Sequence, residues 1–288
     1  MGGAKPKAVI DIDGQECAVK FFDGEAWDQP LIVHACMALA IKAGVTTAQT
    51  RAIRLPAEHA LAVERFDRVG GRRMRSLSAS SLIRAATPQG EAPQFGYPHL
   101  ARRLRALCQV HPLDTHLADL FQRMVFNILI ANTDDHEKNN AVTCEFVGGF
   151  PVWKLSAAYD VVTTGFGATA HEFMIADDVV APGLEAAVSV HRDFNLYEQQ
   201  ARTVVSEVIG VVDGWRADFR EAGVSSDDIE ALAECIDDKD LLVQRERHRT
   251  PATLDQTRRQ PKTGMPPHFS VVAEGMRQAL TARKSARR

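Results

Sequence analysis

A short polar segment from Asn132 to Asn140 combines the residue types that phosphoryl transfer requires. Within it, Asp134 and Asn139 are separated by four residues. In the catalytic loops of kinases, this spacing separates the aspartate that receives the substrate's hydroxyl proton from the asparagine that holds Mg²⁺. Because so short a pattern also arises by chance, it indicates this chemistry only if a second metal carboxylate and a phosphate-pairing lysine accompany it.

Such a carboxylate and lysine are present, in the order that this chemistry needs. Asp160 closes a strand-like run that begins at Val152, and it is the expected second Mg²⁺ ligand beside Asn139. Lys20 lies upstream in the β-rich run Glu16–Phe22 and is expected to pair with the α- and β-phosphates of ATP. Together with the polar loop, these residues predict a site for ATP and Mg²⁺.

The catalytic group of this site is expected to be Asp134, which would orient the incoming hydroxyl. His136 and Lys138 follow two and four residues later, and we expect them to stabilise the loop or the γ-phosphate. An apolar helix that can be followed from Leu120 to Leu129 at three-and-four spacing runs directly into the loop. This helix must therefore position the loop.

The start of the chain has the composition of a phosphate-binding loop. Glycine, which has no Cβ, lets the backbone close over an anion, and lysine adds positive charge. The residues expected at the phosphates are Gly2, Gly3, Ala4, Lys5 and Lys7. A strand at Ala8–Ile12 follows, and the turn Asp13-Gly14 predicts a hairpin that places Lys20 across from the glycine loop.

The rest of the pattern predicts a small β-rich part followed by a larger helical part. A helix at Leu31–Ala43 and strands near Gln49–Leu55 and Leu61–Phe66 complete the first part. After Asp160, the stretch Thr163–Thr169 is expected to form a short activation-type loop. Further helices are predicted at 195–212, 215–222 and 225–236.

Five segments of the chain form one pattern when they are taken in order. They are Gly2–Ala8, Ala18–Phe21, Leu61–Arg68, Asn132–Asn139 and Leu155–Asp160. This pattern resembles the HipA-like serine/threonine kinases, the toxin components of bacterial toxin–antitoxin modules. The resemblance implies an α+β, protein-kinase-like fold with a small β-rich N-lobe and a larger, mainly α-helical C-lobe. It also implies that Glu64 and Phe66 join the lobes beside the adenine of ATP.

The resemblance also implies how the chain is divided into domains and which partners it binds. The expected divisions are an N-lobe at 1–67, a helical C-lobe at 68–245 and a basic, partly disordered tail at 246–288. HipA-like proteins phosphorylate a serine or threonine of a protein target, so we expect a protein substrate. They also bind an antitoxin with a helix-turn-helix domain, so we expect such a partner, with DNA contacted mainly through it.

Two departures from the family pattern indicate an alternative in which catalysis is impaired. Val33 stands where the family usually has a glutamate that pairs with the strand lysine. The glycine loop also begins at Gly2, without the residues that normally precede it, so we expect the family's N-terminal segment to be lacking. The alternative is therefore a catalytically impaired module that binds ATP or an antitoxin without efficient turnover.

A metal-dependent hydrolase is the other class of enzyme that the polar segment permits. Its ligands would be Asp134, Asp135, His136 and Glu137. However, adjacent residues point in different directions, and no second set of histidines or carboxylates accompanies them at helical or strand spacing. Such a hydrolase would hold zinc or a similar metal tightly, whereas a kinase holds Mg²⁺ weakly and together with the nucleotide.

Composition and charge exclude some classes of protein. With 45% hydrophobic and 25% charged residues, the 288-residue chain has the composition of a globular protein. No apolar run reaches the ~18 residues of a membrane span, and no signal peptide is visible, so we expect a cytoplasmic protein without membrane contact. A net charge of −3 argues against general nucleic-acid binding by the whole chain.

Overall fold

The computed structural model describes residues 6–108, 113–164, 170–177 and 183–249. All of the described residues belong to one compact unit, and residues 251–288 lie outside the described residues. The expected phosphate-binding residues Gly2, Gly3, Ala4 and Lys5 also lie outside them, as do residues 165–169 of the predicted activation-type loop. Among the described residues, no helix is long and apolar enough to cross a membrane.

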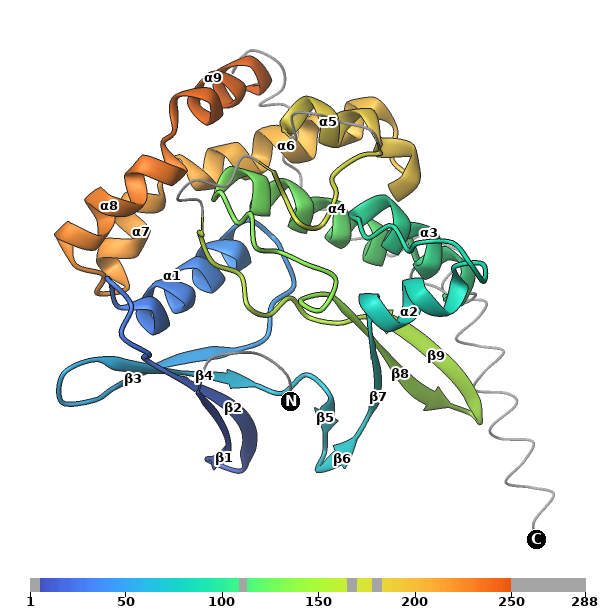
Figure 1. Ribbon diagram of the computed structural model, residues 1–288, viewed down its shortest axis with the longest axis horizontal. Helices are drawn as coiled ribbons and strands as arrows, with labels where there is room; N and C mark the ends of the chain where they lie inside the picture. The colour runs from blue at the N-terminus through green and yellow to red at the C-terminus, as the bar shows by residue number, and fades with distance from the viewer. Residues whose placement is uncertain (1–5, 109–112, 165–169, 178–182, 250–288) are drawn as a thin grey trace, which may run out of the picture. The chain divides into compact units, whose positions relative to one another are not determined.

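The N-terminal part contains a four-stranded antiparallel sheet in the order β1-β2-β4-β3 (Figure 1). Its strands are β1 Lys7–Ile12, β2 Gln15–Phe21, β3 Thr50–Arg54 and β4 His59–Glu64. The predicted hairpin is confirmed, because Asp13 and Gly14 both have positive φ, 55° and 81°, as a tight two-residue turn requires. Lys7 lies opposite Lys20 in the strand register, so the two lysines are neighbours on this sheet.

Helix α1, Gln29–Lys42, covers one face of this sheet (Figure 1). The side chain of Asp28 caps its first turn by accepting a hydrogen bond from the Leu31 N–H at 3.3 Å. The helix is apolar on most of its circumference because it lies between β3 and β4 on one side and α6, Glu198–Val212, and α7, Trp215–Glu221, on the other. No residue of α1 is acidic.

The hydrophobic core runs from the sheet into the helical part. Strand side chains alternate between the two faces of a sheet. Leu61 and Val63 of β4 accordingly join the main core with α1, whereas Ala60 and Ala62 belong to a second, small cluster with residues of β2. The main core continues without interruption into the helices, so the sheet and the helices are held together by shared apolar packing.

Helix α4, Leu113–Leu129, is the centre of the helical part. It packs against α3, α5, α6 and strand β9, and its side chains from Leu120 to Leu129 are nearly all buried. The remaining helices are α2 Ala79–Ala86, α3 Tyr97–Leu107, α5 Leu184–Ser189, the 3₁₀ helix η1 His191–Phe194, α8 Ser226–Ile236 and α9 Lys239–His248. Since α4 is buried along this length, the loop that follows it starts from a rigid base.

The helical part also contains strands, of which the sequence pattern predicts only part of the last. They are β5 Arg68–Val69 and β6 Arg72–Arg73 in one sheet, and β7 Arg75–Ser78, β8 Ala141–Val147 and β9 Phe150–Leu155 in another. The strand predicted from Val152 is confirmed as part of β9. It ends at Leu155, so the expectation that Asp160 closes a strand is wrong, and Asp160 lies in the loop beyond it.

The predicted α+β architecture is confirmed, with a small antiparallel sheet followed by a larger, mainly helical part. Helices α3 and α9 were not predicted. Both are rich in arginine, and α9 has a weak apolar stripe, so periodicity alone gives little sign of it. Helix α9 extends to His248, past the residue at which the composition suggests that the tail begins.

Candidate active site

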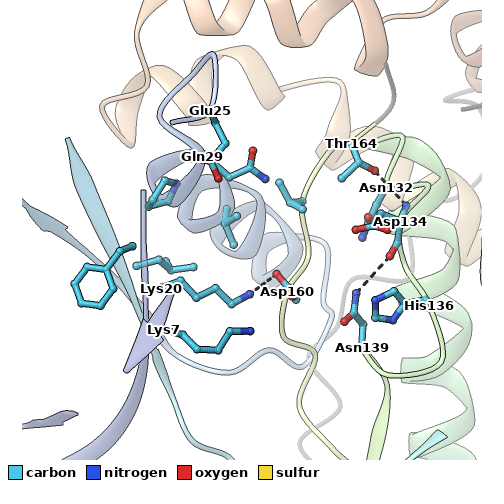
Figure 2. A pocket seen from close by; sticks show the side chains of 15 residues that line it. Lys7, Lys20, Glu25, Gln29, Asn132, Asp134, His136, Asn139, Asp160 and Thr164 are labelled. Atoms are coloured by element: carbon cyan, nitrogen blue, oxygen red, sulfur yellow. Dashed lines mark hydrogen bonds and ion pairs between the residues drawn. The ribbon is translucent and has the colours of Figure 1, made fainter. Parts of the chain in front are cut away.

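A cavity of about 320 Å³ lies where β2 and α1 face the loop that follows α4 (Figure 2). Its lining includes six residues that the sequence analysis singles out, namely Lys7, Lys20, Asp134, His136, Asn139 and Asp160. These residues come from β1, β2 and two separate loops. The structure therefore brings together groups that are far apart in the sequence.

A tight turn at the end of α4 starts the loop that carries Asp134. Ala131 has a left-handed backbone with φ 53°. The N–H of Ala131 donates to the Ile128 carbonyl at 3.1 Å, and that of Asn132 donates to the Asn127 carbonyl at 2.9 Å. These two bonds form a Schellman turn, which satisfies carbonyls that the helix end would otherwise leave unpaired.

A buried polar network lies beneath the loop and fixes Asp135. The carboxylate of Asp135 accepts hydrogen bonds from the Tyr97 hydroxyl and from the side-chain amides of Asn127 and Asn140, both at 3.3 Å. Burial raises the pKa of Asp135, although the Tyr97 hydrogen bond opposes that shift. The guanidinium of Arg123 completes the network by donating to the Asn140 side chain at 3.2 Å. Asp135 therefore has a structural role, whereas the adjacent Asp134 lines the cavity.

The loop is also held by Thr164, which lies in the predicted activation-type loop and has no individual role in the sequence analysis. Its Oγ1 accepts hydrogen bonds from the backbone N–H groups of Thr133 at 3.0 Å and Asp134 at 3.2 Å. Its own N–H donates to the Ala131 carbonyl at 3.2 Å. Thr164 lines the cavity as well (Figure 2). The segment after Asp160 is thus fastened directly to the loop that carries Asp134.

Asp134 and Asn139 both face the cavity. The side chain of Asp134 is exposed, and no hydrogen bond holds its carboxylate in the described part of the chain. The Asn139 side-chain amide lies 3.5 Å from the Asp134 carbonyl, at the limit of a hydrogen bond, which leaves its oxygen available to a ligand. The cavity therefore presents one accessible carboxylate and one accessible amide oxygen from this loop.

Lys20 and Asp160 form an ion pair across the cavity (Figure 2). Asp160 has a left-handed backbone, φ 62°, which aspartate tolerates better than most residues. The family's helix glutamate has no counterpart on α1, and Val33 is a buried residue, 4% exposed, that lines the cavity. In this structure, Lys20 therefore pairs with Asp160, the predicted metal ligand, instead of with a glutamate of α1.

His136 and Lys138 occupy different positions. His136 lines the cavity, and its Nδ1 accepts a hydrogen bond from the Lys138 N–H at 3.2 Å. Lys138 is exposed and does not line the cavity, but its carbonyl accepts a hydrogen bond from the Tyr159 hydroxyl at 2.7 Å. In this structure Lys138 thus links the loop to the Asp160 segment through its backbone.

The segment expected beside adenine lies next to the cavity and does not line it. Glu64 ends β4, and its N–H donates to the Gln49 carbonyl at 2.8 Å. The ring of Phe66 stacks on that of Tyr159, with centroids 5.1 Å apart and planes inclined by 25°. Because Tyr159 precedes Asp160, this stack brings the segment between the lobes to the second loop of the site.

The metal-ligand chemistry of the site suits Mg²⁺ better than zinc. Among the described residues, no group of three or more histidine, cysteine, aspartate and glutamate side chains is arranged to hold a metal ion. Asp135, which a hydrolase cluster would use, is committed to the buried network. The cavity offers oxygen ligands from Asn139 and Asp160. So small an oxygen set matches Mg²⁺, which takes its other ligands from water and substrate phosphates.

The sheet with its lysine, the helix beneath it and the polar loop after a buried helix define a two-lobed fold of the kinase type. The chain belongs to the family of HipA-like C-terminal domains, whose family model matches residues 1–215. That match includes both loops of the site and all of the N-terminal sheet.

Two of the solved structures that are similar to this chain represent a toxin–antitoxin complex and a kinase. One is a chain of the HipA, HipB and operator DNA complex from the toxin–antitoxin system of Shewanella oneidensis MR-1, with 17% identity, a TM-score of 0.61 and coverage of 85% of this chain. The other is the proinflammatory kinase CtkA of Helicobacter pylori, with 12% identity, a TM-score of 0.59 and coverage of 86% of this chain and 93% of CtkA. The present chain spans 64% of the Shewanella chain. No curated protein sequence matches.

Proposed function

We propose that this chain is an ATP- and Mg²⁺-dependent protein kinase that transfers the γ-phosphoryl group of ATP to a serine or threonine hydroxyl of a protein. One observation carries the proposal, namely that Lys20, Asp134, Asn139 and Asp160 line a single cavity. Its volume of about 320 Å³ is at the lower end of the ~300–1,000 Å³ typical of small-molecule sites. Membership of the HipA-like family supports the same reading.

Each group of the cavity has a physical task in this proposal. Lys20 pairs with the α- and β-phosphates, and Asp134 orients the acceptor hydroxyl and takes its proton. Asn139 and Asp160 hold Mg²⁺, which when bound neutralises charge on the phosphate oxygens. Asp134 is suited to its task because its carboxylate is exposed and unpaired among the described residues, whereas Asp135 is buried and hydrogen-bonded.

Binding of the nucleotide is supported by the surroundings of the cavity. Lys7 lines it beside Lys20 and adds a second positive charge, and Val33 and Leu61 add apolar wall. The stacked rings of Phe66 and Tyr159 offer a flat aromatic surface next to the Asp160 loop, suited to contact with adenine. We propose that the segment around Glu64 and Phe66 contacts the base, although neither residue lines the cavity itself.

The absence of an acidic residue on α1 favours a second candidate, a module that binds ATP or a partner but turns over inefficiently. A kinase lysine is normally held by a helix glutamate, which α1 does not provide. Among the described residues, Asp160 is therefore the only ion-pair partner of Lys20. This candidate retains the binding functions of the cavity and predicts nucleotide affinity without measurable transfer.

A protein partner is part of the proposal. The Shewanella structure is of a complex of HipA, HipB and operator DNA. We propose by analogy that this chain binds a helix-turn-helix antitoxin and meets DNA mainly through it. Co-purification with the product of an adjacent small reading frame, followed by an operator-binding assay with and without this chain, tests the partner directly.

The experiment that tests the enzyme is transfer of labelled phosphate from γ-labelled ATP. The purified chain is incubated with Mg²⁺ and a mixture of serine-, threonine- and tyrosine-containing acceptor peptides, and phosphorylated residues are mapped by mass spectrometry. The proposal expects label on serine or threonine that disappears with a chelator. ATP binding without any label would support the impaired module instead, and neither binding nor label would refute both.

Thr164 gives a test of how the Asp134 loop is held. Thr164→Val replaces the hydroxyl with a methyl group of similar size, which leaves the Asp134 N–H without its acceptor and the Thr133 N–H with only the Ala131 carbonyl at 3.1 Å. Loss of such an acceptor costs roughly 1–3 kcal/mol, so we expect kcat to fall about 10-fold or more while the KM for ATP changes little. Thr164→Ser keeps the hydroxyl and should retain most of the activity. Equal kcat values in the two variants would contradict this role.

A further inference from the structure

The end of α4 is supported from a distant part of the chain. The Schellman turn satisfies the carbonyls of Asn127 and Ile128 and leaves that of Leu129, the last residue of the helix, to find another donor. Arg245 of α9 supplies it, with Nη2 donating to the Leu129 carbonyl at 3.0 Å. A cation at the C-terminal end of a helix is also favoured by the helix dipole. Arg245 thus completes the cap of the helix that carries the Asp134 loop.

Arg245 is a buried charge that is held in one place. It is 2% exposed, and its pKa is lowered by burial, while two aspartates oppose that shift. Its Nη2 also donates to the Ile236 carbonyl, and its Nη1 donates to Asp237 Oδ1 at 3.3 Å. The Asp213 carboxylate lies 3.9 Å from the same Nη1. A buried guanidinium with fixed acceptors on several elements has little freedom to move.

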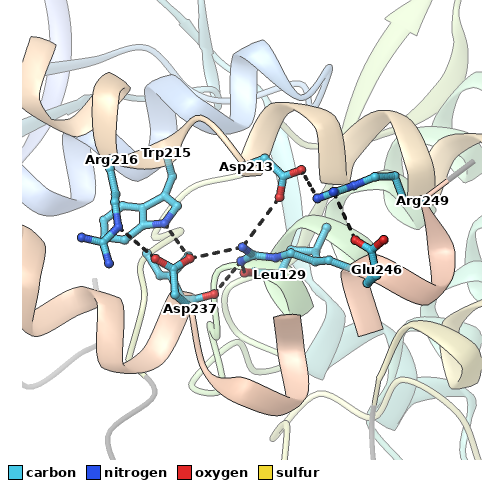
Figure 3. Close-up of polar contacts among 9 residues, drawn as sticks. Leu129, Asp213, Trp215, Arg216, Asp237, Glu246 and Arg249 are labelled. Carbon is cyan, nitrogen blue, oxygen red and sulfur yellow. Dashed lines mark hydrogen bonds and ion pairs between the residues drawn. The ribbon is translucent and has the colours of Figure 1, made fainter. Parts of the chain in front are cut away.

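The two aspartates are themselves fixed by other residues (Figure 3). Asp237 accepts hydrogen bonds from Trp215 Nε1 and Arg216 Nε, both at 3.0 Å. Asp213 accepts a hydrogen bond from Arg249 Nη2 at 2.7 Å. Within the described part of the chain, neither Arg216 nor Arg249 forms a hydrogen bond or ion pair with α4. These two arginines belong to the same charged cluster and provide matched controls for Arg245.

We infer that Arg245 is a positioning residue for phosphoryl transfer, acting through the Leu129 carbonyl on the loop that carries Asp134. Asp134 is only five residues beyond Leu129, and the intervening turn at Ala131 is tight and hydrogen-bonded. A displacement of the helix end would therefore pass into the loop rather than be absorbed. The inference rests on the proposed kinase function and adds α9 to the elements that set the geometry of the site.

The test compares substitutions within the one cluster, in the full chain. Arg245→Met removes the donor while keeping an unbranched apolar chain, and Arg245→Lys keeps a charge that can reach one acceptor at a time. Since a misplacement of ~1 Å can cost ~10²-fold in rate, we expect Arg245→Met to lower kcat about 10- to 100-fold, with the KM for ATP little changed. Arg245→Lys should lie between it and the parent, and Arg216→Ala should stay within about 3-fold of the parent because the Leu129 contact remains.

Amide hydrogen exchange provides a readout that does not depend on activity. We expect Arg245→Lys to speed exchange in a peptide spanning residues 129–135 while a peptide from β2 is unchanged, and Arg216→Ala to change neither. If the parent transfers no phosphate, the proposed function fails, but the exchange result still decides whether Arg245 orders the loop. If Arg245→Met does not fold, Arg245→Lys carries the comparison.

Two results would overturn the inference. One is an equal fall in kcat for Arg245→Lys and Arg216→Ala, which would assign the effect to general loosening around α7, α8 and α9. The other is unchanged exchange in residues 129–135 of Arg245→Lys, which would mean that the loop keeps its order without the full guanidinium.

Discussion

Asp134→Ala is expected to abolish phosphoryl transfer while leaving the fold and nucleotide binding intact. Loss of a positioned base commonly slows a reaction by ~10²–10⁴-fold. Stability should change little, because the side chain is exposed and its carboxylate forms no hydrogen bond with the described residues. The measurement is the single-turnover rate of transfer from ATP, together with calorimetric titration of ATP in the presence of Mg²⁺.

A matched control shows whether the loss of transfer is specific to the carboxylate of Asp134. Glu234→Ala also removes an exposed carboxylate, on α8, and should transfer phosphate at the parent rate. Asp134→Asn is the closer test, because it keeps the size and polarity of the side chain while losing the ability to accept a proton. Transfer by pure Asp134→Ala at the parent rate would remove Asp134 from the catalytic role.

Asp160→Asn is expected to weaken nucleotide binding in a Mg²⁺-dependent way and to slow transfer. Removing one electrostatic stabiliser of a transition state typically costs ~10²–10³-fold in rate. Titrations with ATP, with and without Mg²⁺, should show that the metal strengthens binding to the parent and much less to the variant. An identical Mg²⁺ dependence in the two proteins would count against metal ligation by Asp160.

Lys20→Met is the control for this second result, because it breaks the same ion pair from the other side. It should lower affinity for ATP with and without the metal, since a phosphate partner is lost, whereas the carboxylate expected to hold Mg²⁺ remains. Both partners are partly exposed, at 22% and 38%, so losing the pair should change the free energy of unfolding by no more than ~1 kcal/mol.

The groups in the cavity could be predicted because their signals are local in the sequence. The spacing of Asp134 and Asn139, a lysine in a β-rich run and a carboxylate after another such run are each visible within a few residues. The hairpin was predictable because the Asp13-Gly14 turn has a specific backbone requirement, which the observed φ values meet. The residues that could be predicted are thus those that belong to a short pattern of neighbouring residues.

The supports of these groups could not be predicted, because they are made by tertiary contacts. Thr164 acts through a hydroxyl that meets backbone N–H groups about 30 residues away, and nothing beside it in the sequence indicates this. Tyr97 reaches Asp135 from a helix that the pattern did not reveal. Arg245 directly precedes the predicted basic tail and nothing beside it in the sequence indicates burial, yet it is one of the most deeply buried charges described. The composition of a segment indicates only whether it is exposed on average, whereas the roles of these residues depend on specific contacts in the folded chain.

The ion pair between Lys20 and Asp160 affects how ions enter the cavity. Each charge is neutralised by the other, so a free phosphate competes with Asp160 for the lysine, and a free metal ion competes with Lys20 for the carboxylate. A metal–nucleotide complex offers a new partner to both charges at once. We therefore expect ATP and Mg²⁺ to strengthen each other's binding reciprocally, as thermodynamic linkage requires of any such coupling. Independent binding of the two in a calorimetric titration matrix would show that the pair does not link them.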